Sequence, residues 1–136
     1  MATETSFEGG CFCRSVRYRI SAAPTGSMIC HCQSCRRIAG APVVPWISIP
    51  KAGISLLQGS LTELASSPPV RRSFCSRCGT HILYAHTKDP DSLDVSTCTL
   101  DDPNAFPPTH HSWLAHDLNW VKFGDELPAF PESRYS

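Results

Sequence analysis

The sequence predicts a mainly β fold, built from short antiparallel strands whose turns carry clustered cysteines. Proline and glycine, with 12 and 8 residues, are spread along the whole chain, which disfavours long helices and favours strands joined by turns. Several segments alternate polar and apolar residues, as half-buried strands do. Seven of the eight cysteines fall into three tight groups. The length of 136 residues suits one domain, 1–136.

The clearest strand is 15–20, where Val16, Tyr18 and Ile20 share one face. Because Pro45 cannot donate to a hydrogen-bond ladder, a second strand at 43–49 is expected at a sheet edge or with a bulge. Further strands are predicted at 54–57, 70–74, 80–84, 93–97 and 111–114.

One short helix is predicted at 33–39, ended by Gly40 and Pro42. The proline-rich tail, 123–136, carries Phe130 and Tyr135. We expect this tail to wrap the surface rather than form an element of its own.

Charge and hydropathy exclude several classes of function. The 12 basic and 12 acidic residues give a formal net charge of zero, which argues against a general nucleic-acid or membrane binder. The N-terminal segment, 1–10, includes Glu4 and Glu8 and no apolar run. We therefore expect no secretory signal and no membrane-spanning segment, and a cytoplasmic protein whose thiols stay reduced.

The cysteine spacing favours metal binding over two alternatives. A disulfide scaffold is the first alternative, but it suits oxidising compartments. A thioredoxin-type redox pair at Cys32 and Cys35 is the second, but that motif needs a βαβ unit, and no such alternation is visible. Cys30, directly upstream, is also unexpected for a redox pair. Zinc is the ion that thiolates at this spacing commonly bind.

Two of the cysteine groups combine into one closed site. Cys75 and Cys78 are separated by two residues and followed by Gly79, so a tight turn can aim both sulfurs at one ion. Cys11 and Cys13 serve the same purpose when their turn is sharp. These four cysteines, called the tetrad below, leave tetrahedral zinc no open position. A structural role that ties distant segments together is therefore expected.

The middle group, called the central cluster below, consists of Cys30, Cys32 and Cys35. Three sulfurs leave tetrahedral zinc one corner for water or a substrate. A thiol at such a corner is held as thiolate near neutral pH, below its free pKa of about 8.5. In the closed alternative a further side chain of the protein completes this second site. The sequence offers five such side chains: His31, His81, His110, His111 and Cys98.

Six arginines lie near the cysteine groups and admit two interpretations. They can offset the charge of the thiolates, or they can face a pocket and bind a carboxylate of a substrate. The six are Arg14, Arg36, Arg37, Arg71, Arg72 and Arg77.

Several strings, in order along the chain, are shared with one family. They are Gly9-Gly10-Cys11-x-Cys13-x-x-Val16-Arg17-Tyr18, Cys30-His31-Cys32-x-x-Cys35-Arg36, Gly40-Ala41-Pro42, Phe74-Cys75-x-x-Cys78-Gly79-Thr80, Thr99-Leu100-Asp101-Asp102-Pro103, His111-x-Trp113 and Leu127-Pro128-x-Phe130-Pro131. Over about 8–131 the chain resembles the glutathione-dependent formaldehyde-activating (GFA) and centromere protein V family. The resemblance implies a small, twisted antiparallel β-sandwich with zinc-binding turns. It also implies two zinc ions per chain, a structural one on the tetrad and a catalytic one on the central cluster.

The resemblance further implies a zinc-dependent carbon–sulfur lyase or synthase. The namesake reaction joins glutathione and formaldehyde into S-hydroxymethylglutathione, so a small-molecule thiol or thiol–aldehyde adduct is the expected partner. His31, His81, His110 and His111 are the candidates for the proton donor, and His111 is preferred because it lies in a family string. Arg36, Arg37 and Trp113 are the candidates for substrate binding. The chain departs from the namesake enzymes by being shorter, chiefly after Tyr84 and at its C-terminus.

Two other functions stay open at this point. A non-catalytic zinc module that binds a protein partner predicts a closed second site and an exposed apolar patch. A redox sensor predicts a disulfide between Cys32 and Cys35 once they are free of metal. The sequence favours the enzyme, because the central cluster has no fourth cysteine.

Overall fold

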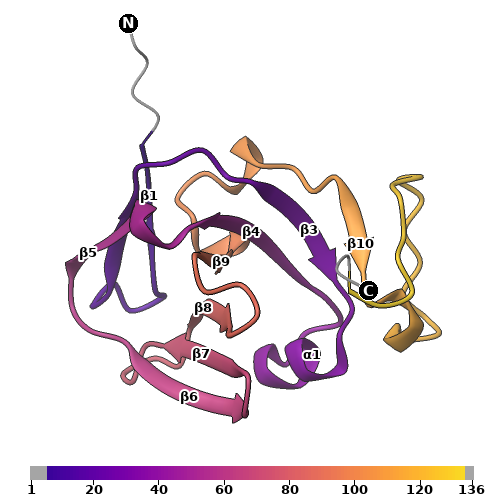
Figure 1. The fold of residues 1–136 in the computed structure, drawn as a ribbon, viewed down its shortest axis with the longest axis horizontal. Helices are drawn as coiled ribbons and strands as arrows, with labels where there is room; N and C mark the ends of the chain where they lie inside the picture. Colours follow the sequence, from indigo (N-terminus) through magenta and orange to yellow (C-terminus); the bar gives the residue numbers. More distant parts are fainter. Residues whose placement is uncertain (1–5, 134–136) are drawn as a thin grey trace, which may run out of the picture.

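The computed structural model describes residues 6–133, which form two sheets and one α-helix (Figure 1). The helix α1 covers Gln33–Ala39, and the short 3-10 helices η1 to η4 cover Lys51–Gly53, Thr97–Thr99, Pro103–Ala105 and Leu114–His116. The strands are β1 (Phe7–Gly10), β2 (Arg17–Ile20), β3 (Gly26–Cys30), β4 (Val44–Pro50), β5 (Ile54–Gln58), β6 (Thr62–Ser67), β7 (Val70–Phe74), β8 (His81–His86), β9 (Ser92–Ser96) and β10 (His110–Ser112).

The two sheets differ in size. The small sheet has the strand order β1-β2-β5, and the large sheet has the order β10-β3-β4-β9-β8-β7-β6. Neighbouring strands are antiparallel, except that β10 runs parallel to β3 and pairs Ser112 with Cys30. The prediction of a mainly β, largely antiparallel fold is confirmed. The parallel pair arises because a long connection after β9 returns the chain to the far edge of the large sheet (Figure 1).

The core lies between the two sheets. Tyr18 and Ile20 of β2 are fully buried and belong to one apolar cluster with Ile47 and Ile49 of β4. The face of 15–20 that the alternation marks as apolar is therefore the buried face. Two sheets that pack their apolar faces together form the β-sandwich that the resemblance implies.

Gly9 stands inside β1 because the backbone there has no room for a side chain. A Cβ atom at this position would meet the hydroxyl group of Tyr18 and the backbone oxygen of Thr99. The Tyr18 hydroxyl also lies 2.7 Å from Thr99 Oγ1, and its burial raises the pKa of Tyr18 to about 12. Close approach of another segment is a usual reason for glycine within a strand.

The prediction for Pro45 is wrong, because this residue does not mark a sheet edge. β4 lies between β3 and β9, and its pairing with both neighbours shows no register shift. Pro45 pairs with Ile29 of β3, whereas the pairing with β9 begins one residue later, at Trp46. The missing N–H group of the proline therefore removes no hydrogen bond from the β9 ladder.

Three strands, β1, β3 and β6, have no counterpart in the predictions. β1 ends in two glycines, which usually mark a turn. Four of the five residues of β3 are buried, so the polar–apolar alternation is lost. β6 is exposed along its whole length and forms the edge of the large sheet beside β7, so it has no apolar face that a pattern could reveal.

The helix α1 has the bounds that the sequence predicts. Gly40 ends it in the left-handed conformation, with φ of +62°, and donates its N–H to the carbonyl oxygen of Arg36 at 2.7 Å. Within residues 6–133, no helix has the length and apolar character of a membrane-spanning segment.

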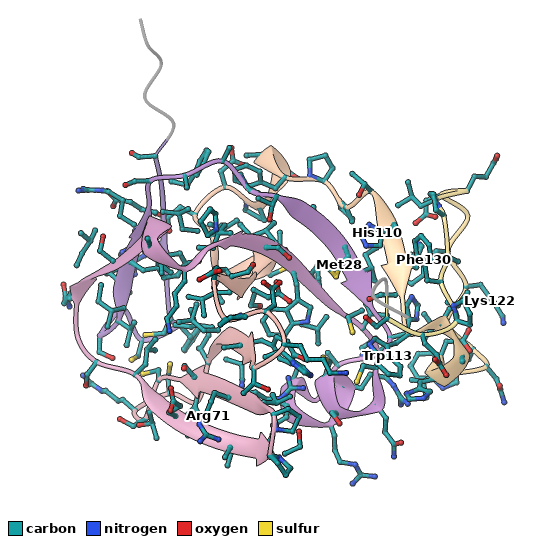
Figure 2. All side chains as sticks on the ribbon, in the orientation of Figure 1. Met28, Arg71, His110, Trp113, Lys122 and Phe130 are labelled. Carbon is teal, nitrogen blue, oxygen red and sulfur yellow. The ribbon has the colours of Figure 1, made fainter. Side chains whose placement is uncertain are left out.

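The described part of the C-terminal tail lies against β10, as expected of a segment that wraps the surface (Figure 1). His111 N donates to Pro128 O at 2.7 Å, and Phe130 N donates to His111 O at 3.0 Å. The ring of Phe130 meets the ring of His110 edge-on, with centroids 5.6 Å apart (Figure 2). Tyr135 falls outside the described residues.

Candidate metal and thiol-binding site

The tetrad joins two turns that lie far apart in the sequence. Cys11 and Cys13 lie in the turn between β1 and β2, and Cys75 and Cys78 lie in the turn between β7 and β8. Their four sulfur atoms all lie within 4.8 Å of one another, with 3.6 Å between Cys11 and Cys13 and 3.8 Å between Cys13 and Cys75. Tetrahedral zinc with Zn–S bonds of about 2.3 Å separates its sulfurs by about 3.8 Å. The four residues therefore fit the ion.

Backbone groups around the tetrad stabilise negative charge on sulfur. The N–H of Val16 lies 3.3 Å from the Cys11 sulfur, and the N–H of Cys78 lies 3.4 Å from the Cys75 sulfur. Gly79 has a φ of +82°, the left-handed conformation that glycine adopts without strain. N–H donors of this kind favour the thiolate form over the thiol.

Two hydroxyl groups that sequence reasoning missed also contact the tetrad. Ser15 Oγ lies 3.1 Å from the Cys13 sulfur and 3.3 Å from the sulfur of Cys75. Thr80 Oγ1 lies 3.2 Å from the Cys78 sulfur, and this hydrogen bond is the main cause that lowers the pKa of Cys78 to about 5. In each case a hydroxyl residue follows a clustered cysteine at the second position, and this spacing is the signal that identifies it.

The central cluster lies at the junction of β3 and α1. Cys30 ends β3, Cys32 directly precedes α1, and Cys35 lies in the first turn of the helix. The three sulfurs lie within 4.8 Å of one another, with 3.7 Å between Cys30 and Cys35, so they also fit zinc. Hydrogen bonds from the two neighbouring thiols lower the pKa of Cys32. Of the three thiols of the central cluster, that of Cys32 therefore loses its proton first.

No fourth protein ligand joins the central cluster in the part of the chain that the structure describes. Between residues 6 and 133, no further His, Cys, Asp or Glu shares the 4.8 Å spacing with its three sulfurs. None of the eight cysteines forms a disulfide. The protein thus holds one group of four sulfurs and one group of three. The side chains that stay outside the group of three include His31, His81, His110, His111 and Cys98.

A buried arginine faces the central cluster. Both terminal guanidinium nitrogens of Arg72 lie 3.8 Å from the Cys35 sulfur, and its Nε donates to Ser66 Oγ at 3.1 Å. The guanidinium carbon lies 5.0 Å from the ring centroid of Tyr84, and Arg72 is 3% exposed. Its neighbour Arg71 on β7 (Figure 2) is exposed. Of the two interpretations of the arginines, Arg72 fits the one in which a cation offsets thiolate charge.

A chain of hydrogen bonds connects His31 to the C-terminal segment. His31 Nε2 lies 2.9 Å from His111 Nδ1, and His111 Nε2 lies 3.0 Å from Asp125 Oδ2. Because a carboxylate only accepts, His111 carries its proton on Nε2, and its Nδ1 then accepts from His31. The ring of Phe123 contacts both imidazoles, at centroid distances of 5.7 Å and 4.9 Å. Both ring nitrogens of His111, the predicted proton donor, are thus engaged inside the protein.

Two cavities lie beside α1, lined by different sets of its residues. The first has a volume of ≈ 330 Å³ and reaches the central cluster at Cys35. The second has a volume of ≈ 400 Å³ and contains both arginines of α1. The first is lined chiefly by Cys35, Ile38, Val44, Trp46, His81 and Cys98. The second is lined chiefly by Gln33, Arg36, Arg37, Gly40, Leu118 and Trp120.

The three predicted substrate-binding residues lie outside the lining of the first cavity. Arg36 and Arg37 line the second cavity. Arg36 also donates from Nε to His31 O at 3.3 Å and from a terminal nitrogen to His116 O at 3.0 Å. Trp113 is half-buried and packs against the apolar residues around the central cluster. Figure 2 shows Trp113 between the ends of β10 and α1.

Comparison with known proteins assigns the chain to a family. The family described as "Glutathione-dependent formaldehyde-activating enzyme" matches residues 6–116. An uncharacterised lyase of Schizosaccharomyces pombe is 28% identical over 115 residues, which cover 74% of this chain and 83% of that protein. A Halomonas elongata protein, provisionally named a glutathione-dependent formaldehyde-activating enzyme, is 28% identical over 129 residues, which cover 85% and 79%.

A crystal structure of a Rhodobacter sphaeroides protein shares the fold. It has a TM-score of 0.59 and 18% identity, over 90% of this chain and 98% of that one. The family match includes all eight cysteines and spans most of the chain. The chain therefore belongs to the family of glutathione-dependent formaldehyde-activating enzymes and is a lyase.

Proposed function

We propose that this lyase is zinc-dependent and makes or breaks the carbon–sulfur bond of a thiol–aldehyde adduct, as S-(hydroxymethyl)glutathione synthase does. One observation carries the proposal. The central cluster has three sulfurs at zinc spacing, no fourth ligand among the described residues, and a cavity at Cys35. An open metal position beside a cavity is the arrangement of a catalytic site, whereas the tetrad has the closed arrangement of a structural one.

Two zinc ions fit the chain, one held by the tetrad and one by the central cluster. The second ion, when bound, supplies a site where a substrate thiol is stable as a thiolate at neutral pH. Arg72 stabilises the negative charge that accumulates at Cys35. Its burial strengthens this effect, because the charge pair is screened little by solvent.

The reaction is an addition without oxidation or reduction. The sulfur of the thiol bonds to the carbonyl carbon, the C=O double bond becomes a C–O single bond, and the carbonyl oxygen gains the proton that the thiol gave up. We assign His111 a positioning role in this reaction, because its ring nitrogens hold His31 and Asp125. His31 in turn lies directly between Cys30 and Cys32 in the chain.

Arg36 and Arg37 are proposed to bind a carboxylate of the thiol, since both line the second cavity. Trp113 is proposed to support the thiol side of the site through its packing against the central cluster. The unpaired cysteines suit a reducing compartment, so we also propose a cytoplasmic location.

Metal analysis and cobalt replacement test the proposal. We expect two zinc ions per chain and, with cobalt at the central cluster, a change of the visible spectrum when a thiol is added. Cys32→Ser is expected to lose one metal ion and all turnover of a thiol–aldehyde adduct while the fold persists. Retained turnover in this variant would reject the assignment.

The second candidate function is that of a non-catalytic zinc module that binds a protein partner. It is favoured by Phe12, which is 89% exposed on the tetrad turn. This alternative predicts a cobalt spectrum that does not respond to thiols. It also predicts that Phe12→Ser abolishes partner binding, whereas the enzyme hypothesis predicts full activity for that variant.

A further inference from the structure

We propose that the cavity at Cys35 binds an uncharged, apolar carbon substituent of the aldehyde, so that the carbonyl substrate of this chain is larger than formaldehyde. The inference rests on the proposed function, and it concerns the part of the substrate that the family name leaves unspecified. Three observations support the inference: the chemistry of the cavity wall, the cavity volume, and the location of Arg36 and Arg37 in the second cavity.

The wall of this cavity carries no carboxylate, ammonium or guanidinium group among the described residues that line it. Burial, followed by the charge of Arg72, lowers the pKa of His81, so this imidazole is neutral at physiological pH. A charged substituent would lose part of its hydration here without an oppositely charged residue on the wall, which is unfavourable. The apolar part of the wall consists of Ile38, Ala39, Val44 and Trp46.

The volume of ≈ 330 Å³ far exceeds what formaldehyde needs. A water molecule occupies about 30 Å³ of the liquid, and formaldehyde, with two heavy atoms, needs roughly twice that. A longer substituent would displace water from apolar side chains, and each buried CH₂ group then improves affinity about fourfold. The cavity therefore has room for a substituent of several carbons.

The two arginines of α1 lie in the other cavity. Arg36 and Arg37 line the second cavity, whereas Cys35 and Ala39 of the same helix line the first. The central cluster lines the first cavity through Cys35, whereas the second cavity begins at Gln33, the residue after Cys32 in the chain. The arginines that are proposed to bind a charged thiol therefore lie outside the cavity that is proposed to bind the aldehyde substituent.

Cys98 provides a readout that needs no turnover. It is exposed, lines the cavity and is the single cysteine of the tryptic peptide 89–122. Zinc-loaded protein is alkylated with iodoacetamide, and the modification of this peptide is followed by mass spectrometry. Pentan-1-ol, an unreactive mimic of pentanal, is expected to slow the alkylation of Cys98 at least threefold. Pentanoate, equally long but charged, is expected to give no protection.

Turnover measurements with different aldehydes give a second test of the inference. With one thiol held constant, we expect kcat/KM to rise at least tenfold from acetaldehyde to pentanal. We expect 5-oxopentanoate, which has the same chain ending in a carboxylate, to fall at least tenfold below pentanal. Ala39→Leu fills the cavity and should abolish both the protection by pentan-1-ol and the preference for pentanal. The matched variant Ala52→Leu, on exposed η1 and outside both cavities, should change neither.

The outcomes separate the two proposals. Turnover of formaldehyde without protection by pentan-1-ol, or with pentanal no better than acetaldehyde, overturns the inference and leaves the proposed function standing. Equal protection by pentanoate also overturns the inference. Protection without turnover of any thiol–aldehyde pair overturns the proposed function, and the assignment of the cavity to an aldehyde falls with it.

Discussion

Arg72 of the large sheet faces Cys35 of the central cluster, with both terminal nitrogens of the arginine 3.8 Å from the cysteine sulfur. Arg72 comes from β7 and is held by Ser66 and by the ring of Tyr84. A guanidinium group in this position faces the charge that three thiolates would place on the site. It thereby supports metal binding without occupying a ligand position.

Arg72→Gln is expected to lower the affinity of the central cluster for zinc by roughly 10- to 100-fold, a usual effect of losing a group that supports metal ligands. The cause is uncompensated negative charge at Cys35. Competition with a chromophoric chelator measures the affinity, and the tetrad ion serves as an internal reference. Arg71→Gln is the matched control, because Arg71 is exposed and lies 3.6 Å from Glu63. Equal zinc retention in both variants would remove the role given to Arg72.

Asp125→Ala is expected to loosen the C-terminal segment along β10. Without the carboxylate 3.0 Å from its Nε2, His111 loses the partner that orients its ring toward His31. Amide hydrogen exchange in peptides that cover 110–115 and 123–130 should accelerate by about tenfold. Glu126→Ala is the matched control, since Glu126 is exposed and one residue away. Unchanged exchange in the Asp125 variant would show that the hydrogen bond to His111 does not hold the segment.

Removal of a cysteine of the tetrad is expected to lower stability, whereas removal of a cysteine of the central cluster is expected to lower activity. Cys13 and Cys75 lie 62 positions apart, so a metal ion between them ties the turn of the small sheet to that of the large sheet. Cys75→Ser should lower the free energy of unfolding by more than about 2 kcal/mol, as measured by urea denaturation. Cys32→Ser should lower it clearly less. An equal loss in the two variants would contradict the division into a structural and a catalytic site.

The pair of Arg17 and Asp101 is expected to give a pH-dependent contribution to stability. Its two hydrogen bonds, at 2.9 Å and 2.6 Å, lower the pKa of Asp101 from 3.8. A lowered folded-state pKa means that the contribution is present above a pH of about 4 and is lost as the pH falls through the folded-state value. Both side chains are partly exposed, so the contribution should be below about 1 kcal/mol.

Comparison of Asp101→Asn with the parent chain measures this contribution. Asp101→Asn should be less stable than the parent at pH 6, by urea denaturation, and the difference should vanish at a pH below the folded-state pKa of Asp101. Arg17→Met should cost less when added to Asp101→Asn than in the parent, because only the 3.7 Å contact of Arg17 with Glu8 then remains to be lost. A difference that persists at the lower pH would assign the effect to something other than the charge of Asp101.

The metal-binding residues could be predicted because cysteine spacing is a local property. Cys30, Cys32 and Cys35 lie within six residues, so the covalent chain and one turn of helix bring them together whatever the rest of the fold does. Strand 15–20 could also be predicted from the sequence, because one of its faces is buried and the other is not. The strand β3 could not be predicted, because it is buried on both faces and its sequence does not alternate between polar and apolar residues.

The residues around the metal-binding cysteines could not be predicted, because their positions depend on pairings between distant segments of the chain. His31 and His111 are 80 residues apart, and only the parallel pairing of β10 with β3 sets them side by side. In β7, alternation implies that one of Arg71 and Arg72 faces inward, but nothing local selects Arg72.

The sequence by itself determined a largely antiparallel β chain with one group of four thiols and one of three, because residue spacing and alternation act over a few residues. The tertiary structure alone decided which arginine faces Cys35, that His111 is held between His31 and Asp125, and that Arg36 and Arg37 line a different cavity from Cys35. Those relationships follow from how the sheets, the helix and the C-terminal segment pack, which is set by the whole chain at once.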